Sequence, residues 1–284
     1  LSDDGKHFIL NGQKMWITNG GFADVYIVFA KIDDDRKLSC FIVDKGTPGL
    51  SVGEEEKKLG IKGSSTVQVY LEDCKIPSDN MLGEREEGFK IALNILNAGR
   101  IKLASSANGA SKSTLEHALR YASERKQIGA HLTSFQVIQH KIAEMAQRTF
   151  TSDTATLACG DDIERFEKDL LRNSNVNDFA SKRDALEEYA VECALLKVIG
   201  SEALDHVIDE GLQIYGGMGY SAEAPMERAH RDARITRIYE GTNEINRMAG
   251  AGMAIQNIQK NFLRTLITIC REKAVATITF PKRA

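Results

Sequence analysis

The stretch TVQVYLEDCKIPSDNMLGEREEGFKIALNIL, residues 66–96, decides the fold class because the apolar pattern changes its period within it. Thr66–Leu71 alternates in the manner of a β-strand, whereas from Glu86 onward apolar residues recur at about every 3.6 positions, as in a helix. Strand-like patterning reaches back to His7, and helical patterning continues to about Met253. The sequence therefore predicts an α+β protein, an antiparallel β-domain followed by an up-and-down four-helix bundle.

The two halves have distinct expected elements. Strands are predicted over residues 7–10, 14–18, 25–31, 38–43 and 66–71. Asn11-Gly12 predicts a hairpin turn between the first two strands, because both central positions of that turn need positive φ. In the helical half, 160–181 is polar and weakly periodic, which predicts a connection, and Ala185 begins a helix that runs to about Gln213. The predicted domains are a partial middle β-domain at 1–83, a helical bundle at 84–262 and a tail at 263–284.

Composition excludes several classes of function. The chain has 284 residues, is 42% hydrophobic and 27% charged, and has a net charge of −3, so no nucleic-acid partner is expected. No apolar run reaches the roughly 18 residues that a membrane-spanning helix needs. The five cysteines are far apart, without a CxxC pair or a histidine at ligand spacing, which predicts free thiols in a reducing compartment and no metal site.

Four motifs could carry chemistry. The first is KMWITNGG, residues 14–21, where Trp16 and Thr18 precede a glycine turn. A tryptophan that simply covers the sheet would explain it, and so would an apolar platform for a flat cofactor ring beside a hydroxyl donor.

Two further motifs could bind phosphate groups. QIYGGMGY, residues 213–220, places glycines after a helix, where they could be helix caps or could let backbone N–H groups approach a pyrophosphate. No strand precedes it, so it is not a Rossmann fingerprint. In RKQIG, residues 125–129, Arg125 could interact with a helix C-terminus or with a phosphate, and Gln136 follows shortly after.

The fourth motif, RIYEGTNEINR at residues 237–247, contains Glu240 at the end of a short helix and before a turn that opens the next one. This acid could be an anion that favours a helix N-terminus. Alternatively, Ile238 and Tyr239 could desolvate it and raise its pKa above ~4.3, which suits a general base.

Together, WITNGG, RKQIG, QIYGGMGY and IYEGTNEINR resemble the acyl-CoA dehydrogenase family over roughly residues 5–255. The resemblance implies FAD as cofactor, a homodimer or homotetramer, and a middle β-domain with a carboxyl-terminal four-helix domain. It implies that Trp16 and Thr18 line the flavin, with Thr18 donating toward its N5. The other implied cofactor contacts, several of them to FAD of a neighbouring subunit, are Arg125, Gln136, Gln213, Gly216, Gly217, Thr242 and Glu244.

By the same resemblance Glu240 removes the pro-R α-proton of an acyl-CoA thioester while the β-hydride goes to the flavin, which gives a trans-2-enoyl-CoA. In the family the backbone N–H of this glutamate and a ribityl hydroxyl polarise the thioester carbonyl. The implied substrate contacts are Asn97, Arg100, Tyr239 and Gly241. Some relatives carry the base at the position of Gly99, and the glycine there favours Glu240.

Several finer expectations accompany the resemblance. Residues 56–61, 97–100 and 217–220 look most like the very-long-chain branch, although little chain follows Arg247 for the extra region of that branch. The chain starts at Leu1 without an initiator Met, so we expect an upstream helical domain with further flavin contacts. Electrons are expected to pass to an electron-transferring flavoprotein, in the cytoplasm of a bacterium or in the mitochondrial matrix of a eukaryote. The alternatives are an acyl-CoA oxidase and a non-catalytic scaffold with this fold.

Overall fold

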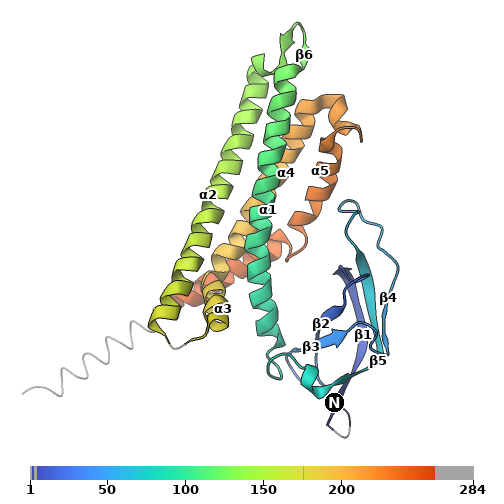
Figure 1. Ribbon diagram of the computed structural model, residues 1–284. Helices are drawn as coiled ribbons and strands as arrows, with labels where there is room; N and C mark the ends of the chain where they lie inside the picture. Colours follow the sequence, from blue (N-terminus) through green and yellow to red (C-terminus); the bar gives the residue numbers. More distant parts are fainter. Residues whose placement is uncertain (1, 3–4, 175, 260–284) are drawn as a thin grey trace, which may run out of the picture.

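The computed structural model describes residues 2, 5–174 and 176–259, and it has the predicted α+β architecture (Figure 1). Long helices form an elongated bundle, and a β-domain lies beside one end of it. The first long helix contacts the β-domain directly, through strands β2 and β3 described below. The predicted tail at 263–284 lies outside the described residues, and the boundary between residues 83 and 84 stays a prediction.

The β-domain is built from two antiparallel sheets. One sheet has the order β1-β5-β4, with β1 at His7–Thr18, β5 at Thr66–Pro77 and β4 at Leu50–Val52. The other pairs β2, Val25–Ala30, with β3, Ser39–Asp44. Alternate side chains of these strands form one apolar core, whose buried members include Phe8, Leu10, Val28, Phe41, Val43, Val67 and Ile76.

The predicted hairpin turn at Asn11-Gly12 is wrong. Strand β1 passes through both residues without reversing, and its pairing with β5 shifts register between Leu10 and Gly12. The Asn11 side chain donates to Asp73 Oδ1 at 3.0 Å and accepts from the Asp73 backbone N–H at 2.7 Å. These cross-strand bonds stabilise a β-bulge, in which Gly12 adopts φ +143°, so the dipeptide bends a strand instead of ending it.

The bundle is formed by α1 at Gly88–Glu124, α2 at Gln136–Asn173, α4 at Ala190–Tyr215 and a helix over 243–259. The short elements are η1 at Ser78–Asn80, β6 at Lys126–Gln127, β7 at Ala130–His131, η2 at Leu132–Ser134, α3 at Asp178–Glu188, η3 at Gly216–Tyr220, α5 at Pro225–Ala233 and η4 at Arg234–Arg237. Small buried residues such as Ala104, Ala118 and Gly200 allow α1 and α4 to pack closely.

The prediction of a connection over 160–181 is wrong, because α2 continues to Asn173. Charged side chains in its last turns form pairs at helical spacing, as Lys168 does with Glu164, and such pairs support a solvent-exposed helix. The actual connection is short and ends where the Asn177 side chain accepts from the Ala180 backbone N–H at 2.8 Å, an N-cap for α3. The helix predicted from Ala185 to about Gln213 is also divided, since α3 ends at Glu188 and α4 begins at Ala190.

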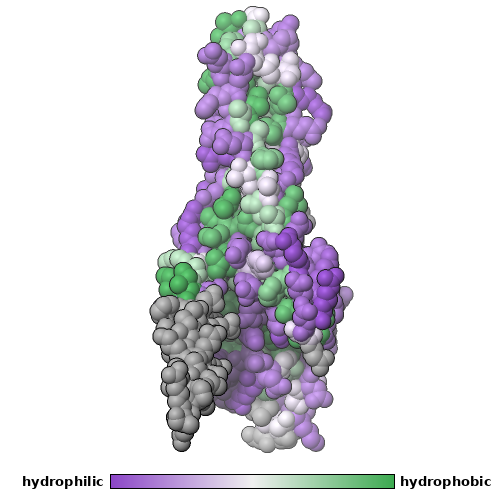
Figure 2. Space-filling model, turned by 90° about the vertical axis from the view of Figure 1, so that its left-hand side faces the viewer, coloured by the Kyte–Doolittle hydropathy of each residue, from purple (hydrophilic) through white to green (hydrophobic). Residues whose placement is uncertain are grey.

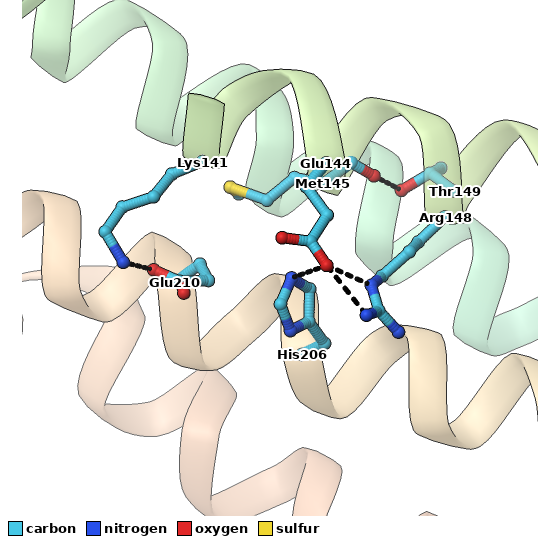
Figure 3. Close-up of polar contacts among 7 residues, drawn as sticks. All are labelled: Lys141, Glu144, Met145, Arg148, Thr149, His206 and Glu210. Atoms are coloured by element: carbon cyan, nitrogen blue, oxygen red, sulfur yellow. Dashed lines mark hydrogen bonds and ion pairs between the residues drawn. The ribbon is translucent and has the colours of Figure 1, made fainter. Parts of the chain in front are cut away.

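Polar contacts fix α2 against α4 (Figure 3). Lys141 of α2 pairs with Glu210 of α4, and Glu144 accepts from Arg148 Nη2 at 2.7 Å and lies 3.6 Å from His206 Nε2. The Arg148 guanidinium and, to a smaller extent, the nearby His206 lower the pKa of Glu144. These contacts fix the position of α2 along α4. They lie beside Met145, which is fully buried in the core of the bundle.

One face of the bundle carries exposed apolar side chains. Figure 2 shows hydrophobic residues along the length of the face toward α2. On α2 itself Val137, Phe150 and Leu157 are more than half exposed, at 61%, 73% and 63%. Within the described ranges no helix is both long and apolar enough to cross a membrane.

Candidate active site

Glu240 lies in a strained turn between η4 and the helix over 243–259. Its φ is +57°, and that of Gly241 is +83°. A non-glycine residue with positive φ is energetically unfavourable by about 1–3 kcal/mol and persists only where its surroundings hold it. The turn is therefore expected to have strong local contacts.

Buried donors supply those contacts on the carbonyl side of the turn. Lys197 Nζ of α4 donates to Gly241 O at 2.7 Å. Asn246 Nδ2 lies within hydrogen-bond distance of the carbonyls of Glu240, Gly241 and Thr242, at 3.2, 2.8 and 3.1 Å. Arg100 Nε of α1 donates to Glu240 O at 3.4 Å, and all three donor residues are almost fully buried. The carbonyls thus face the protein interior.

The carboxylate of Glu240 lies against α1 at Gly99. A Cβ atom at position 99 would lie 2.6 Å from Glu240 Oε2, so only glycine leaves this space free. Arg100, the next residue, is held by Asn97 Oδ1 at 3.2 Å from its Nη1. Burial lowers the pKa of Arg100, and the nearby Glu240 charge partly opposes that effect.

A groove of about 720 Å³ leads away from Glu240 between α1, α4 and α5. Glu240 and Tyr239 line it together with residues spaced along α1 from Gly99 to His117, a span of about 27 Å at 1.5 Å per residue. Many of the side chains that line it are small or apolar, among them Leu103, Ala107, Ala110, Leu204, Ile208 and Ala233. This shape suits a narrow, extended apolar ligand.

The β-domain reaches the edge of this groove. Asp232 of α5, which lines the groove, accepts from the Ile61 backbone N–H at 2.6 Å. Its neighbour Arg231 donates to Leu59 O at 3.1 Å. A loop of the β-domain is therefore fixed beside the helices that carry Glu240.

Trp16 and Thr18 lie elsewhere on the β-domain, at the end of β1. Trp16 has φ +62° at a register shift between Lys14 and Ile17, and its side chain is 59% exposed. Thr18 is exposed as well. Among the described residues they do not belong to the lining of the Glu240 groove, so the structure does not by itself bring them to the base.

Five other predicted residues gather at the far end of the bundle. Arg125 follows α1, Gln136 begins α2, and Gln213, Gly216 and Gly217 lie at the end of α4, where all five are exposed. Stacking of Tyr121 on Tyr215, with ring centroids 4.1 Å apart, joins the ends of α1 and α4. Gly216 has φ +58°, and a Cβ at 216 or 217 would meet no atom within 4 Å.

Thr242 and Glu244 lie at the start of the helix that follows the base. Thr242 Oγ1 accepts from the Ile245 backbone N–H at 3.3 Å, which caps this helix. Hydrogen bonds from its own backbone N–H and from the Thr242 hydroxyl lower the pKa of Glu244. The capping role therefore belongs to these residues and not to the Glu240 carboxylate.

Sequence patterns did not point to Lys197 and Asn246, which hold the turn, or to Asn243, which accepts from Lys197. Lys197 is the only charged residue in the apolar run Cys193–Gly200. A single cation on a helix face that is otherwise apolar and buried could have identified it as a residue with a specific partner. Asn243 and Asn246 lie inside the fourth motif, on one face of the helix. The sequence alone does not show which groups their side chains contact. Within the described residues, no cluster of three or more His, Cys, Asp or Glu side chains is arranged to hold a metal ion.

The structure combines a β-domain with a helical bundle and places a carboxylate beside an apolar groove. Comparison with known protein families identifies the class of protein that has this arrangement. Residues 1–74 match the middle domain of acyl-CoA dehydrogenases, and residues 86–254 match their C-terminal domain. The chain belongs to the acyl-CoA dehydrogenase family.

Several relatives support this assignment. A probable acyl-CoA dehydrogenase of Bacillus subtilis is 46% identical over 87% of this chain and 41% of its own length. The human mitochondrial short-chain specific enzyme is 41% identical over 89% of this chain and 58% of its own length. A crystal structure of an acyl-CoA dehydrogenase complexed with FAD from Bacillus anthracis superposes with a TM-score of 0.86 at 43% identity, covering 92% of this chain and 45% of that one. The chain thus spans about half the length of these relatives.

Proposed function

We propose that this chain is part of an enzyme that oxidises fatty acyl-CoA thioesters to trans-2-enoyl-CoA, with Glu240 as the base for the α-proton. The observation that supports this most strongly is the placement of the Glu240 carboxylate. It lies at the end of an apolar groove, in space that only Gly99 leaves free, on a backbone held by buried donors. A helix-capping anion would need none of these features.

FAD is the proposed cofactor, and the exposed residues fit it. The glycines at 216 and 217 leave open space beside backbone N–H groups, and Arg125 adds a cation that suits a diphosphate. Gln136 and Gln213 offer amide groups at the same end of the bundle, and Trp16 and Thr18 offer a flat ring and a hydroxyl. When bound, FAD supplies the acceptor for the hydride from the β-carbon.

The residues of this chain have separate roles in the proposal. The groove along α1 takes the acyl chain, Tyr239 and Gly241 flank the thioester, and the Glu240 carboxylate accepts the α-proton. The backbone N–H of Glu240 polarises the thioester carbonyl. Arg100 and Asn97 support the turn from α1, as their contacts indicate. Thr242 and Glu244 are proposed to contact the cofactor.

An oligomer and an electron acceptor complete the proposal. The apolar face of α2 would be covered in a homodimer or homotetramer, which would bring the far end of the bundle to FAD of a neighbouring subunit. The electrons would leave to an electron-transferring flavoprotein. A matching location is the bacterial cytoplasm or the mitochondrial matrix. Preference for very long acyl chains stays a prediction, which rates with C4 and C16 substrates would test.

Anaerobic reduction of the flavin by acyl-CoA tests the function. Glu240→Gln is expected to keep FAD bound and to lower the reduction rate by a factor of ~10²–10⁴, because the amide cannot accept the proton. Glu187→Gln, at an exposed carboxylate of α3, is the matched control and should keep the wild-type rate. Reduction of the Glu240→Gln variant at the wild-type rate would exclude Glu240 as the base, and fast reoxidation in air would identify an oxidase.

A further inference from the structure

We propose that Lys197 is a positioning residue for Glu240, holding the carbonyl side of the turn in the interior so that the carboxylate is directed into the groove. This inference rests on the proposed function and extends it to a residue that contacts neither the groove nor the carboxylate oxygens. It follows from the acceptors of Lys197, from its burial and from the backbone conformation of the turn.

The acceptors of Lys197 are unusual for a buried cation. Its side chain is fully buried, and a buried ammonium group is expected to pair with a carboxylate because burial of an isolated charge is unfavourable. Instead, Nζ donates to Gly241 O at 2.7 Å and to Asn243 Oδ1 at 2.8 Å, both neutral oxygens. A charge-assisted hydrogen bond to a carbonyl is stronger than a neutral one, so the turn gains an anchor that packing alone would not supply.

Two asparagines accompany Lys197, one as its acceptor and one as a further donor to the turn. Asn243 is itself oriented by Ser201 Oγ, which accepts from its Nδ2 at 3.0 Å. Asn246 directs its amide group at three successive carbonyls of the turn, and its own Oδ1 is buried without a hydrogen-bond partner among the described residues. The N–H groups of this amide are therefore directed to the carbonyls of the turn, which adds a second set of donors beside Lys197.

The backbone of the turn explains why such anchors are needed. Glu240 has φ +57°, a conformation that an L-residue leaves readily unless its surroundings fix it. With its carbonyl held inside by Asn246 and Arg100, and the next carbonyl held by Lys197, the side chain of Glu240 is directed toward Gly99 and the groove. Loss of the Lys197 anchor would leave the carboxylate free to move away from the substrate position.

The surroundings of Lys197 make the strength of its hydrogen bond to the turn depend on pH. The charged groups that act on it are Arg100 of α1, Glu202 of α4, and Glu240 and Glu244 of the turn and the following helix. Burial, and next the Arg100 charge, lower the pKa of Lys197 to about 8, while the glutamates oppose this. The ammonium group therefore loses its proton within an accessible pH range, and the anchor on Gly241 weakens above it.

Two variants of the FAD-loaded, full-length enzyme test the inference. Lys197→Met removes the donor at nearly constant volume, and Lys141→Met is the control, because Lys141 joins α2 to α4 away from the turn. We expect Lys197→Met to lower the rate of flavin reduction at saturating acyl-CoA by ~10–100-fold, as a misplaced base does, with the affinity for acyl-CoA within twofold of wild type. The control should keep the wild-type rate.

Hydrogen–deuterium exchange in the protein without substrate provides a readout independent of activity. The amides of residues 238–246 should exchange faster in Lys197→Met and, after correction for intrinsic rates, faster in the wild type at pH 9 than at pH 7. The wild-type pH comparison applies even if the variant does not fold. Unchanged exchange in both experiments, or a loss of rate that only follows a loss of FAD or acyl-CoA, would overturn the positioning role. Failure of the wild type to reduce its flavin would instead reject the proposed function.

Discussion

The Glu240 turn and the far end of the bundle each carry a group of candidate residues, and the two regions are built in opposite ways. The turn is fixed from within by buried donors, among them Lys197 and Asn246. At the far end Arg125 is exposed, and Gly216 and Gly217 face open space. A base must be placed before substrate arrives, whereas residues that bind a large cofactor can remain open until it does. The chain therefore fixes the position of its proposed base by itself, and the proposed cofactor-binding end stays open.

The largest expected effect concerns the turn: Lys197 should make the free energy of unfolding depend on pH. Its folded pKa of about 8 lies below its ordinary value of 10.5, so between these values the unfolded chain binds more protons than the folded one. Global unfolding exposes Lys197 to water, so the free energy of unfolding should rise with pH across that window, by about 3 kcal/mol. Local opening of the turn differs, because Lys197 stays buried on α4 and loses only its acceptor on Gly241, so loss of its proton loosens the turn while the whole fold becomes more stable. Denaturant titrations at several pH values should show this rise in the wild type, and the rise should be absent in Lys197→Met. Equal slopes for the two proteins would contradict it.

Replacement of Gly99 by alanine should damage the base site without damaging the fold. The new Cβ would meet Glu240 Oε2 at 2.6 Å, and the flexible carboxylate would move before the helices do. We expect flavin reduction to slow by about 10²-fold, the effect of a displacement near 1 Å. Gly109→Ala on the same helix is the control, since a Cβ there meets nothing within 4 Å. Alanine favours the helix over glycine by up to about 1 kcal/mol, so both variants should be at least as stable as the wild type. A slower rate in Gly99→Ala alone would then not be due to a loss of stability.

Arg125→Ala should change the far end of the bundle and leave the Glu240 turn as it is. Loss of a charged hydrogen-bond donor to the cofactor should weaken FAD binding by about 1.5–3 kcal/mol, or roughly 10- to 100-fold, and leave exchange of the Glu240 turn unchanged. Fluorescence titration of the apoprotein with FAD measures this affinity. Arg120→Ala, which removes an exposed pair with Glu116, is the control and should bind FAD as the wild type does. Equal affinities of the two variants would remove Arg125 from the cofactor site.

The smallest effect is expected for a substitution at the α2–α4 contact, which lies between the Glu240 turn and the far end of the bundle. Lys141→Met breaks the partly buried pair with Glu210 that joins α2 to α4, so the free energy of unfolding should fall by about 1 kcal/mol. Neither FAD affinity nor the rate of flavin reduction should change, because the pair touches neither region. Thermal unfolding and the two functional assays check this together. A change in either activity would show that the regions are coupled through the bundle.

The sequence predicted features that depend on local pattern. The change of period near Glu86 predicted the α+β class, and the fourth motif predicted a turn beside Glu240, although not its positive φ. It could not give the contacts across the fold, because Lys197 meets Gly241 only after α4 packs beside the turn. Local rules also failed where tertiary contacts overrode them. The Asn11 side chain bonds to Asp73 and turns an expected hairpin into a bulge, and charge pairs keep residues 160–173 helical.

Exchange of the substrate α-proton with solvent shows whether Glu240 is the base that removes it. The FAD-loaded enzyme is incubated in deuterated water with an acyl-CoA analogue that binds but cannot be oxidised, and deuterium at the α-carbon is measured by mass spectrometry. The wild type should incorporate deuterium, and Glu240→Gln should incorporate none while binding the analogue equally well. Incorporation by Glu240→Gln at the wild-type rate would show that another group removes the α-proton.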